Sequence, residues 1–428
     1  MESFVVKGGQ PLKGEIRAAG NKNAALPILA ACLLTDQEVH LTNVPAIRDV
    51  ETMLNLMSDL GVSIRRLGPN EVVVHAKECL KTDLRHDLAS TIRGSLLLAG
   101  PLLARCGRVV MPRPGGDLIG RRRVDTHLLA LESLGAECDV NHVRYTMHAD
   151  KGLVGQDIFL DEMSVTATEN AIMAAVRARG TTIIRNAASE PHIQDLISFL
   201  CSLGARIEGC GTNVLTIHGV DGLSGGRYRI QPDHTEVGSL IALAAATHSE
   251  VTIKDCIPDH LRMILMVFRR LGVNVEIRGN DVFVPRHDRL HVVFDAHGAI
   301  PKIDDGPWPA FPTDMLSITI VLATQAEGTV LIWEKMFEGR MFFVDKLLAM
   351  GARLVLCDPY RVVVVGPSQL HGEELTSPDI RAGVALLTAA LCAEGTSIIR
   401  NVGQIDRGYE RIEERLRAIG AQIERVSE

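Results

Sequence analysis

One phrase recurs six times along this chain of 428 residues and constrains its fold more than any other feature. The phrase is Leu-Gly or a close variant, then an apolar residue, any residue and a second apolar residue. Its copies are roughly 70 to 80 residues apart, and they begin at Leu60, Leu134, Leu203, Leu271, Met350 and Ile419. Self-similarity at a regular period indicates one supersecondary unit that is used repeatedly.

Each copy belongs to a longer pattern. A short apolar segment with strand character precedes it at 38–44, 107–113, 180–186, 250–255, 328–334 and 395–401. An apolar segment rich in small residues comes before each strand, at 23–34, 90–104, 164–176, 236–247, 313–324 and 378–391. These segments predict helices that are apolar nearly all round and therefore buried, whereas the second helix of each repeat, such as 49–61 or 407–420, is amphipathic and predicted to half-face solvent.

The repeat therefore predicts an α/β fold in which each unit runs helix, strand, helix, strand, strand. Six such units suit two domains of three units better than one domain, given usual domain sizes. The glycine-rich, polar stretch at 221–230 is the best candidate boundary between the third and fourth units.

Composition excludes several classes of protein. A net charge of -7 argues against a nucleic-acid-binding surface over the whole molecule, so any anion site must be local. Nine cysteines stand singly, without a CxxC pair, which favours buried thiols and a cytoplasmic location. No apolar run approaches the roughly 18 residues of a membrane span. No GxxxxGK, HExxH or Cys/His spacing indicates a phosphate loop or a metal site.

The stretch 111–125, MPRPGGDLIGRRRVD, predicts a break in regular structure. Its prolines cannot donate backbone hydrogen bonds, and its glycines allow unusual backbone conformations. It carries one carboxylate, Asp117, followed by three arginines, Arg121–Arg123. A mobile anion-binding lid and an ordinary solvated turn both fit this pattern.

The N-termini of the predicted buried helices carry polar residues. Asp and Ser there are ordinary capping residues. Lysine and arginine oppose the helix dipole, so we expect each of them to have an anionic partner. Two further arginines follow predicted strands in the fifth and sixth repeats, as Arg121–Arg123 do in the second. The candidate cationic cluster comprises Lys22, Arg93, Arg122, Arg340, Arg381 and Arg407, against the carboxylates Asp117, Glu190, Asp314 and Asp379. Such a cluster suits a ligand with several negative groups, although a structural ion-pair network is the alternative.

Six segments resemble the signature segments of the enolpyruvyl transferases, and within them of the enzymes that act on UDP-N-acetylglucosamine. The resemblance covers essentially the whole chain, and its segments are 18–29, 114–127, 164–170, 309–315, 377–383 and 404–416. It implies two domains of three βαβαββ units each, 22–231 with the mobile loop 111–125 and 1–21 plus 232–428, with the active site in the cleft between them.

The resemblance also implies a reaction. The enolpyruvyl group of phosphoenolpyruvate would pass to the 3-hydroxyl of UDP-N-acetylglucosamine with release of phosphate, by addition and elimination, as the first committed step of peptidoglycan precursor synthesis. Neither a metal nor an organic cofactor is implied, and neither is an obligate protein partner, a nucleic acid or a membrane.

Residue roles follow from the same resemblance. They would be as follows: Lys22, Arg122 and Arg407 on the phosphate of phosphoenolpyruvate; Arg340 and Arg381 on its carboxylate; Asn23, Arg93, Arg122, Ser164, Val165 and Asp314 on the nucleotide-sugar; and Asp117, Asp314, Asp379 and Lys22 in catalysis. Asp314 would be the base for the acceptor hydroxyl, Asp379 its partner near the methylene carbon, and Asp117 the proton donor.

Several positions depart from the family pattern. Most members carry cysteine, the target of fosfomycin, where this chain has Asp117, so we expect an active enzyme that is insensitive to fosfomycin. Glu162 replaces a frequent lysine and Thr166 a usual glycine, while His234 and Trp308 replace a frequent arginine and histidine. Two alternatives therefore stay open. One is an enolpyruvyl transferase with another acceptor, a nucleotide of secondary metabolism or shikimate 3-phosphate, and the other is a catalytically silent nucleotide-sugar-binding paralogue.

Overall fold

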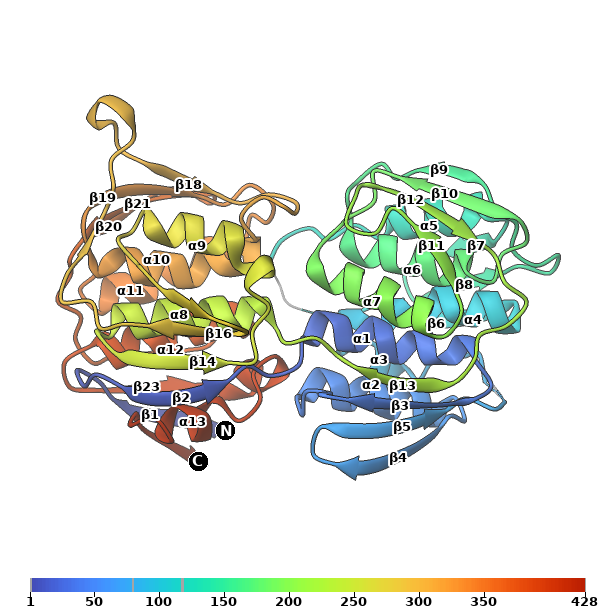
Figure 1. The fold of residues 1–428 in the computed structure, drawn as a ribbon, viewed down its shortest axis with the longest axis horizontal. Helices are drawn as coiled ribbons and strands as arrows, with labels where there is room; N and C mark the ends of the chain where they lie inside the picture. The colour runs from blue at the N-terminus through green and yellow to red at the C-terminus, as the bar shows by residue number, and fades with distance from the viewer. Residues whose placement is uncertain (1, 79–80, 117–118, 428) are drawn as a thin grey trace. The chain divides into compact units, whose positions relative to one another are not determined.

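A computed structural model describes residues 2–78, 81–116 and 119–427 of the chain (Figure 1). Asp117, to which the resemblance assigns proton donation, lies outside the described residues. The chain forms two compact units. Unit 1 comprises Met1–Ala19, Leu118–Arg121 and Pro232–Glu428, and unit 2 comprises Gly20–Asp117 and Arg122–Gln231.

Unit 2 contains the first three repeats. Its α-helices are α1 (Lys22–Ala31), α2 (Arg48–Asp59), α3 (His86–Ala89), α4 (Ala99–Cys106), α5 (Asp125–Ser133), α6 (Val165–Ala175) and α7 (Pro191–Ser202). Its strands are β3 (Glu38–Thr42), β4 (Ser63–Gly68), β5 (Glu71–His75), β6 (Arg108–Pro112), β7 (Glu137–Val140), β8 (Arg144–His148), β9 (Asp157–Phe159), β10 (Thr181–Arg185), β11 (Arg206–Glu208), β12 (Val214–His218) and β13 (Gly226–Arg229).

Unit 1 contains the other three repeats together with the N-terminal strands. Its α-helices are α8 (His234–Ala246), α9 (Arg262–Arg269), α10 (Leu316–Thr324), α11 (Val344–Ala349), α12 (Ile380–Cys392) and α13 (Ile412–Arg417). Its strands are β1 (Glu2–Lys7), β2 (Lys13–Arg17), β14 (Glu250–Lys254), β15 (Glu276–Arg278), β16 (Asp281–Val284), β17 (Leu290–His291), β18 (Lys302–Asp304), β19 (Ala326–Trp333), β20 (Leu354–Asp358), β21 (Arg361–Gly366), β22 (Glu374–Thr376), β23 (Thr396–Arg400) and β24 (Gln422–Ser427).

The six repeats form six small sheets of one design among the described residues, which confirms the predicted α/β repeat. In the order β9-β10-β12-β11, the first pair is parallel and the other pairs are antiparallel. The buried helix α6 connects the parallel pair, as a parallel connection requires a crossover. In the second repeat a single parallel bridge between Asp83 and Val110 stands in the place of the first strand.

Two strands lie next to the points where the chain passes from one unit to the other, and neither belongs to the same unit as the helix that follows it. Strand β2 immediately precedes α1 but pairs in parallel with β14 of unit 1. Strand β13 immediately precedes α8 but pairs in parallel with β3 of unit 2. The first repeat therefore takes its first strand, β13, from the far end of unit 2, and the fourth repeat takes its first strand, β2, from the N-terminal part of unit 1.

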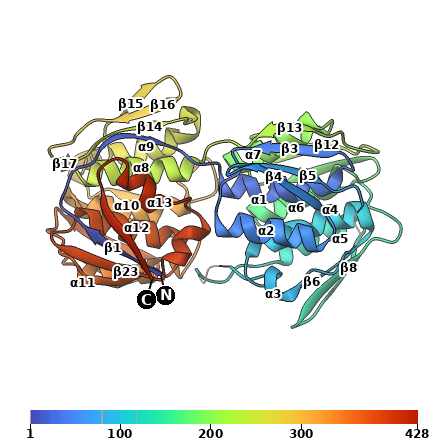
Figure 2. The same ribbon diagram turned by 90° about the horizontal axis from the view of Figure 1, so that it is seen from below.

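The N-terminal strand completes the sixth sheet. Strand β1 lies between β23 and β24 and is antiparallel to both, with Glu2 of β1 paired with Ser427 of β24. Figures 1 and 2 show β1 next to β23. Arg425 of β24 reinforces this closure because its guanidinium binds Asp406 at 2.7 Å, Glu413 at 2.7 Å and Glu2 at 3.3 Å.

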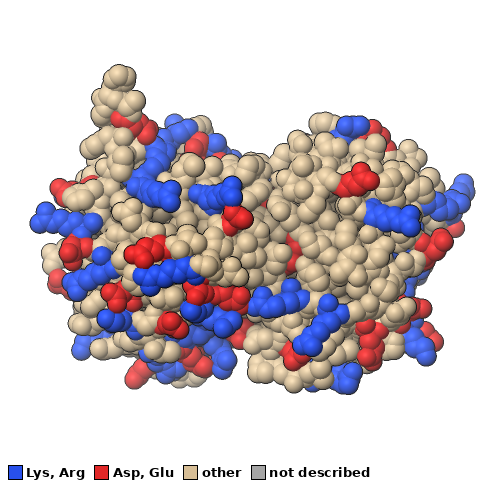
Figure 3. All heavy atoms as spheres, viewed as in Figure 1, with Lys and Arg blue, Asp and Glu red and all other residues tan. Residues whose placement is uncertain are grey.

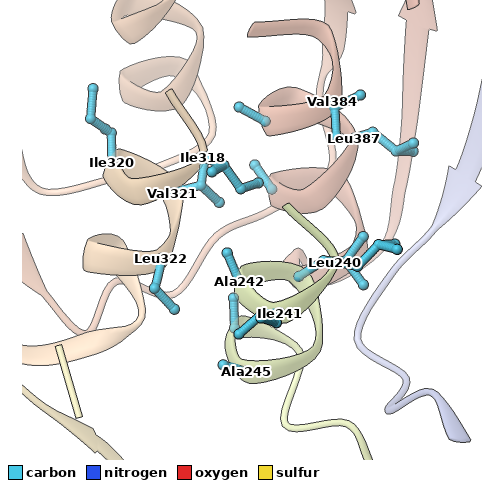
Figure 4. Packing of buried hydrophobic residues seen from close by; sticks show 14 of the residues in the cluster. Leu240, Ile241, Ala242, Ala245, Ile318, Ile320, Val321, Leu322, Val384 and Leu387 are labelled. Carbon is cyan, nitrogen blue, oxygen red and sulfur yellow. The ribbon is translucent and has the colours of Figure 1, made fainter. Parts of the chain in front are cut away.

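The three apolar helices of unit 1 form its core. Every residue of α8 and α10 is buried, as the apolar character of these segments nearly all round the helix predicts. Figure 4 shows Leu240 and Ile241 of α8 together with side chains of α10 and α12, the last including Val384 and Leu387.

Several expected helices have α-helical parts shorter than their sequence patterns, and two of them have an identifiable cause. The apolar segment 90–104 begins as a 3-10 helix, Arg93–Leu98, and becomes α-helical only from Ala99. Pro101 lacks the N–H that a continuous α-helix would use there. The amphipathic segment 407–420 is α-helical only over α13, because Arg411 takes a left-handed conformation with φ of 39° just before it.

Charges on the face drawn in Figure 3 are interspersed, with basic and acidic side chains side by side on each unit. Many are paired, such as Arg185 with Asp157 at 2.8 Å. Across the described part of the chain, no helix has both the length and the hydropathy needed to cross a bilayer.

Core packing leads to a stability prediction. Leu387 of α12 is fully buried, so Leu387→Ala is expected to cost about 2–5 kcal/mol through lost contacts and the cavity left behind. Urea unfolding followed by circular dichroism measures the loss. Leu348→Ala, the same truncation at a site that is 46% exposed, is the control and should change stability by less than about 0.5 kcal/mol. Equal losses in the two variants would contradict the assignment of the core.

Candidate functional site

Asp314 of unit 1 lies between two buried arginines. It belongs to the 3-10 turn Thr313–Met315 that leads into α10. Arg340 Nη2 donates to Asp314 Oδ1 at 2.5 Å, and Arg381 Nε donates to Asp314 Oδ2 at 2.9 Å. The arginine side chains are 8% and 7% exposed, whereas Asp314 is 23% exposed. The outcome is one accessible carboxylate with a cation on each of its oxygens.

Tyr409 holds Arg381 from the interior. Arg381 Nη1 donates to Tyr409 Oη at 3.0 Å, and Ser239 of α8 lies 3.0 Å from the same oxygen. The tyrosine is 2% exposed, and the guanidinium lies over its ring at 5.4 Å. The helices that carry Ser239 and Arg381 and the turn that carries Tyr409 therefore fix the direction of this guanidinium.

Asp379 has a structural role in addition to any chemical one. It is the N-cap of α12, and its Oδ1 accepts hydrogen bonds from the N–H groups of Arg381 at 2.8 Å and Ala382 at 2.9 Å. Asp233 caps α8 in the same way. Capping, one of the two explanations that the sequence allowed, is thus observed for both, whereas Asp314 caps no helix.

In unit 2, Lys22 is the first residue of α1 and already has an anionic partner. Its Nζ lies 2.7 Å from Asp49 Oδ2 of α2, and both side chains are nearly buried. Asn21 caps the helix, and Asn23 is half-buried one residue beyond Lys22. The cation at this helix N-terminus is therefore neutralised by the chain itself.

Arg93 and Arg122 form a second cationic group in unit 2. Burial, followed by the positive charge of Arg122, lowers the pKa of Arg93 to about 10, and the negative charge of Glu162 partly opposes this shift. Arg93 Nη2 donates to the backbone oxygen of Arg123 at 2.7 Å. Arg123 itself pairs with Asp161 at 2.8 Å, which gives it a structural role. Arg93 and Arg122 are thus neighbouring cations, an arrangement that suits an anionic ligand.

His127 is a buried, neutral histidine in the same unit. Asn170 Nδ2 lies 2.9 Å from its Nδ1, and Thr166 Oγ1 lies 3.0 Å from its Nε2. Because Asn170 is the donor to Nδ1, Nε2 carries the proton and donates to Thr166. Burial, followed by the charge of Arg93, lowers the pKa of His127 to about 3. The family departure at Thr166 thus has a specific hydrogen-bond partner.

The segment Ile119–Arg121 is bound by the turn that precedes Arg340. Gly339 N donates to Ile119 O at 2.9 Å, and Arg121 N donates to Glu338 Oε1 at 3.0 Å. Gly120 has φ of 127°, and a Cβ there would lie 2.5 Å from Glu338. These hydrogen bonds lie within unit 1, to which Ile119–Arg121 belongs. The predicted break in regular structure after β6 is confirmed for the described residues 113–116 and 119–124.

The remaining expected residues lie at helix termini. Arg407 ends the 3-10 helix Val402–Arg407, and its Nη1 donates to Gln404 at 2.9 Å. Ser164 caps α6, with Val165 as the first helical residue. Glu190 is the N-cap residue of α7, and its charge adds to burial in raising the pKa of Glu169.

Two family departures pack against each other. The rings of His234 and Trp308 meet edge to face, with centroids 6.0 Å apart. Burial lowers the pKa of His234 to about 4. The two positions at which the chain departs from the family pattern are therefore in direct contact.

Among the residues that the structure describes, no group of three or more His, Cys, Asp or Glu side chains is placed to hold a metal ion. Eight described cysteines are free thiols.

Comparison with known proteins decides the family. The model of the EPSP synthase family (3-phosphoshikimate 1-carboxyvinyltransferase) matches residues 6–416. The chain belongs to this family. It is similar to proteins named UDP-N-acetylglucosamine 1-carboxyvinyltransferase, at 58% identity to that of Bradyrhizobium diazoefficiens, covering 99% of this chain and 98% of the relative. Identity to the Treponema denticola protein of the same name is 53%, covering 99% of each.

Solved structures show the same fold. The enolpyruvyl transferase NikO from Streptomyces tendae matches with a TM-score of 0.88 at 24% identity, covering 100% of this chain and 99% of that one. EPSP synthase from Acinetobacter baumannii matches with a TM-score of 0.77 at 18% identity over the full length of both. The resemblance to enolpyruvyl transferases that the sequence carried is thereby confirmed.

Some residues that contact the candidate cations of this EPSP synthase family member were not predicted from the sequence. Asp49, Tyr409 and Glu334 contact the expected cations, yet each lies in a segment whose pattern is explained by an amphipathic helix, a turn or a strand end. Only Glu334 carried a signal, a carboxylate directly after the apolar strand 328–333. The expected anionic partners of Lys22 and Arg381 are thus supplied by the protein.

The buried histidine leads to a prediction about pH. His127 stays neutral in the fold down to about pH 3, whereas an exposed histidine gains a proton near its ordinary 6.5. The parent should therefore lose stability as pH falls below 6.5, and His127→Gln should lack this loss. We expect the free energy of unfolding of the variant to gain about 1–2 kcal/mol on the parent between pH 7 and pH 5. Urea unfolding at several pH values tests this, with His142→Gln on the surface as the control. Parallel pH curves for parent and His127→Gln would refute the prediction.

Proposed function

We propose that this chain is a transferase that moves the enolpyruvyl group of phosphoenolpyruvate to the 3-hydroxyl of UDP-N-acetylglucosamine, with release of phosphate. Full-length relatives at 58% and 53% identity bear the name of this activity. The observation that carries the proposal is the Asp314 carboxylate between the guanidinium groups of Arg340 and Arg381. A proton acceptor next to two cations is what addition of a hydroxyl to an anionic enol phosphate requires.

Phosphoenolpyruvate brings a phosphate and a carboxylate. In our proposal Arg340 and Arg381 bind the carboxylate, and Lys22, Arg122 and Arg407 bind the phosphate. A guanidinium has five N–H donors, of which Asp314 and Tyr409 take two from Arg381, so a substrate carboxylate can be bound while Asp314 stays in place. Fixed cations stabilise the charge that develops as phosphate leaves.

The nucleotide-sugar would contact unit 2. We assign Asn23 to the sugar, Arg93 and Arg122 to the diphosphate, and Ser164 with Val165 to the nucleotide end. The free N–H groups at the start of α6 suit an acceptor on the ligand. The negative charge of Glu162 acts on Arg93 and partly offsets its positive charge, which weakens the attraction of Arg93 for the diphosphate.

Proton transfers are assigned to three carboxylates. Asp314 would accept the proton of the acceptor hydroxyl, with Asp379 near the methylene carbon and Asp117 as its proton donor. The two units would be the two domains of the enzyme, with limits close to 22–231 and 1–21 plus 232–428. A place at the start of peptidoglycan precursor synthesis and a cytoplasmic location belong to the same proposal.

Removal of the base tests the mechanism. Asp314→Asn keeps one of the two oxygen acceptors that the arginines use, but it cannot take up a proton at neutral pH. Phosphate release from phosphoenolpyruvate in the presence of UDP-N-acetylglucosamine should fall by roughly 10²–10⁴-fold. Asp259→Asn is the matched control and should retain parental turnover, because the Asp259 side chain is 78% exposed and pairs with Arg262 on the surface. Undiminished turnover in Asp314→Asn would overturn the assigned roles.

The acceptor is tested separately. UDP-N-acetylglucosamine, shikimate 3-phosphate and a free nucleotide are offered in turn to the parent, and only the first is expected to release phosphate. Release with another acceptor alone would replace the substrate but keep the reaction. No release with any of the three would favour a silent nucleotide-sugar-binding protein.

Asp117 leads to a prediction about inhibition. A carboxylate is a far weaker nucleophile toward an epoxide than a thiolate, so fosfomycin should leave the parent active after prolonged incubation. Asp117→Cys is expected to become sensitive and to gain the mass of one fosfomycin. Mass spectrometry and residual activity measure both outcomes. A covalent adduct on the parent at Asp117 would contradict the prediction.

A further inference from the structure

A buried carboxylate lies behind the Arg340–Asp314 ion pair in unit 1. Glu334 follows β19 directly and is completely buried. Its Oε1 accepts hydrogen bonds from the N–H groups of Met336 and Phe337, both at 2.9 Å. The side chain therefore closes the tight turn that leads from β19 to Arg340.

Glu334 also contacts the two sides of the ion pair. Its Oε2 lies 3.8 Å from Arg340 Nε, and Thr313 Oγ1 donates to the same oxygen at 3.0 Å. Thr313 is the residue immediately before Asp314. One carboxyl group thus reaches both the arginine and the backbone that carries its aspartate.

A second buried carboxylate faces Glu334. Asp305, 1% exposed, follows β18, and its Oδ1 accepts the N–H of Lys335 at 2.6 Å. Its Oδ2 is buried, and no N–H or hydroxyl group of the described residues donates a hydrogen bond to it. Burial, followed by the hydrogen bond to Asp305 and its charge, raises the pKa of Glu334 to about 8. One proton between the two acids satisfies the otherwise unmatched oxygen, because two buried carboxylates in contact do not both ionise.

We propose that Glu334 and Asp305 are a proton-sharing pair of positioning residues that hold Arg340 and Asp314 in their catalytic geometry. A neutral Glu334 accepts the two backbone N–H groups without neutralising Arg340, which leaves the guanidinium charge for Asp314 and for an anionic substrate. An ionised Glu334 would draw Arg340 toward itself from 3.8 Å and compete with Asp314. This inference rests on the proposed function of the site.

The experiment compares two substitutions at one position. Glu334→Gln keeps the oxygen acceptor and supplies an N–H to Asp305, so it reproduces the protonated acid and should stay within about threefold of the parent in kcat/KM. Glu334→Ala removes the acceptor and should raise KM for phosphoenolpyruvate about tenfold while KM for UDP-N-acetylglucosamine stays unchanged. Glu327→Ala, on the same strand with a side chain that is 60% exposed, is the control.

A pH profile adds a readout that packing alone would not change. The groups that face Glu334 are Asp305, Arg340, Thr313 and the backbone N–H groups of residues 336 and 337. Above about pH 8 the parent should lose kcat/KM for phosphoenolpyruvate as Glu334 ionises, and Glu334→Gln should lack this loss. Identical profiles, or equal rises in both KM values for Glu334→Ala, would overturn the proposal.

Unfolding separates this proposal from the proposed function. Glu334 keeps its proton in the fold above its ordinary pKa of 4.5, so its contribution to stability declines as pH rises from about 4.5 to about 8. Stability of the parent relative to Glu334→Gln should therefore decrease over that range, whichever acceptor the enzyme uses. An unchanged difference would show that Glu334 is ionised throughout and would refute the shared proton, even if turnover with UDP-N-acetylglucosamine is found.

Discussion

Burial of helices that are apolar on every side is the constraint on which this structure depends. Such a helix needs cover around its full circumference, and one repeat offers only a small sheet and one amphipathic helix. In unit 1 the helices α8, α10 and α12 solve this by packing on one another, with their own sheets outside. Three repeats together therefore enclose one core, and the N-termini of their three buried helices belong to the same unit.

Those N-termini explain the electrostatic character of the site. Lysine or arginine at a helix start is unfavourable because it opposes the helix dipole. The chain offsets this with its own carboxylates, Asp49 for Lys22 and Asp314 for Arg381. In unit 1, Tyr409 also contacts Arg381, and Glu334 also contacts Arg340. Cations that are buried, paired and hydrogen-bonded are kept in one orientation without a ligand, which lowers the entropic cost of binding one.

Prediction from sequence succeeded where the signal was periodic and failed where it was pairwise. Apolar runs such as 236–247 fill one buried helix, and the recurring phrases fall where the repeats do. The ends of elements were less predictable, since Pro101 divides one helix and the left-handed Arg411 shortens another. Lys22, Arg93 and Arg381 were found because a positive charge is unusual at a helix start, and the other candidate cations because they follow strands at the same place in their repeats. Asp49, Glu334 and Asp305 were not, because an acidic residue on a helix or after a strand is ordinary until its neighbours are known.

The sequence by itself determined the repeat, the burial of its first helices, the family and the set of charged residues available for chemistry. Only the tertiary structure decided which charges meet. Arg340 is 26 residues from Asp314 and Arg381 is 67 residues from Asp314, so no local pattern relates the three. The pairing partners of β2 and β13 are equally unpredictable from the sequence, because each strand is adjacent in sequence to a helix of the other unit. Local propensity acts over a few residues, whereas pairing of strands and neutralisation of buried charge depend on distances that only the folded chain sets.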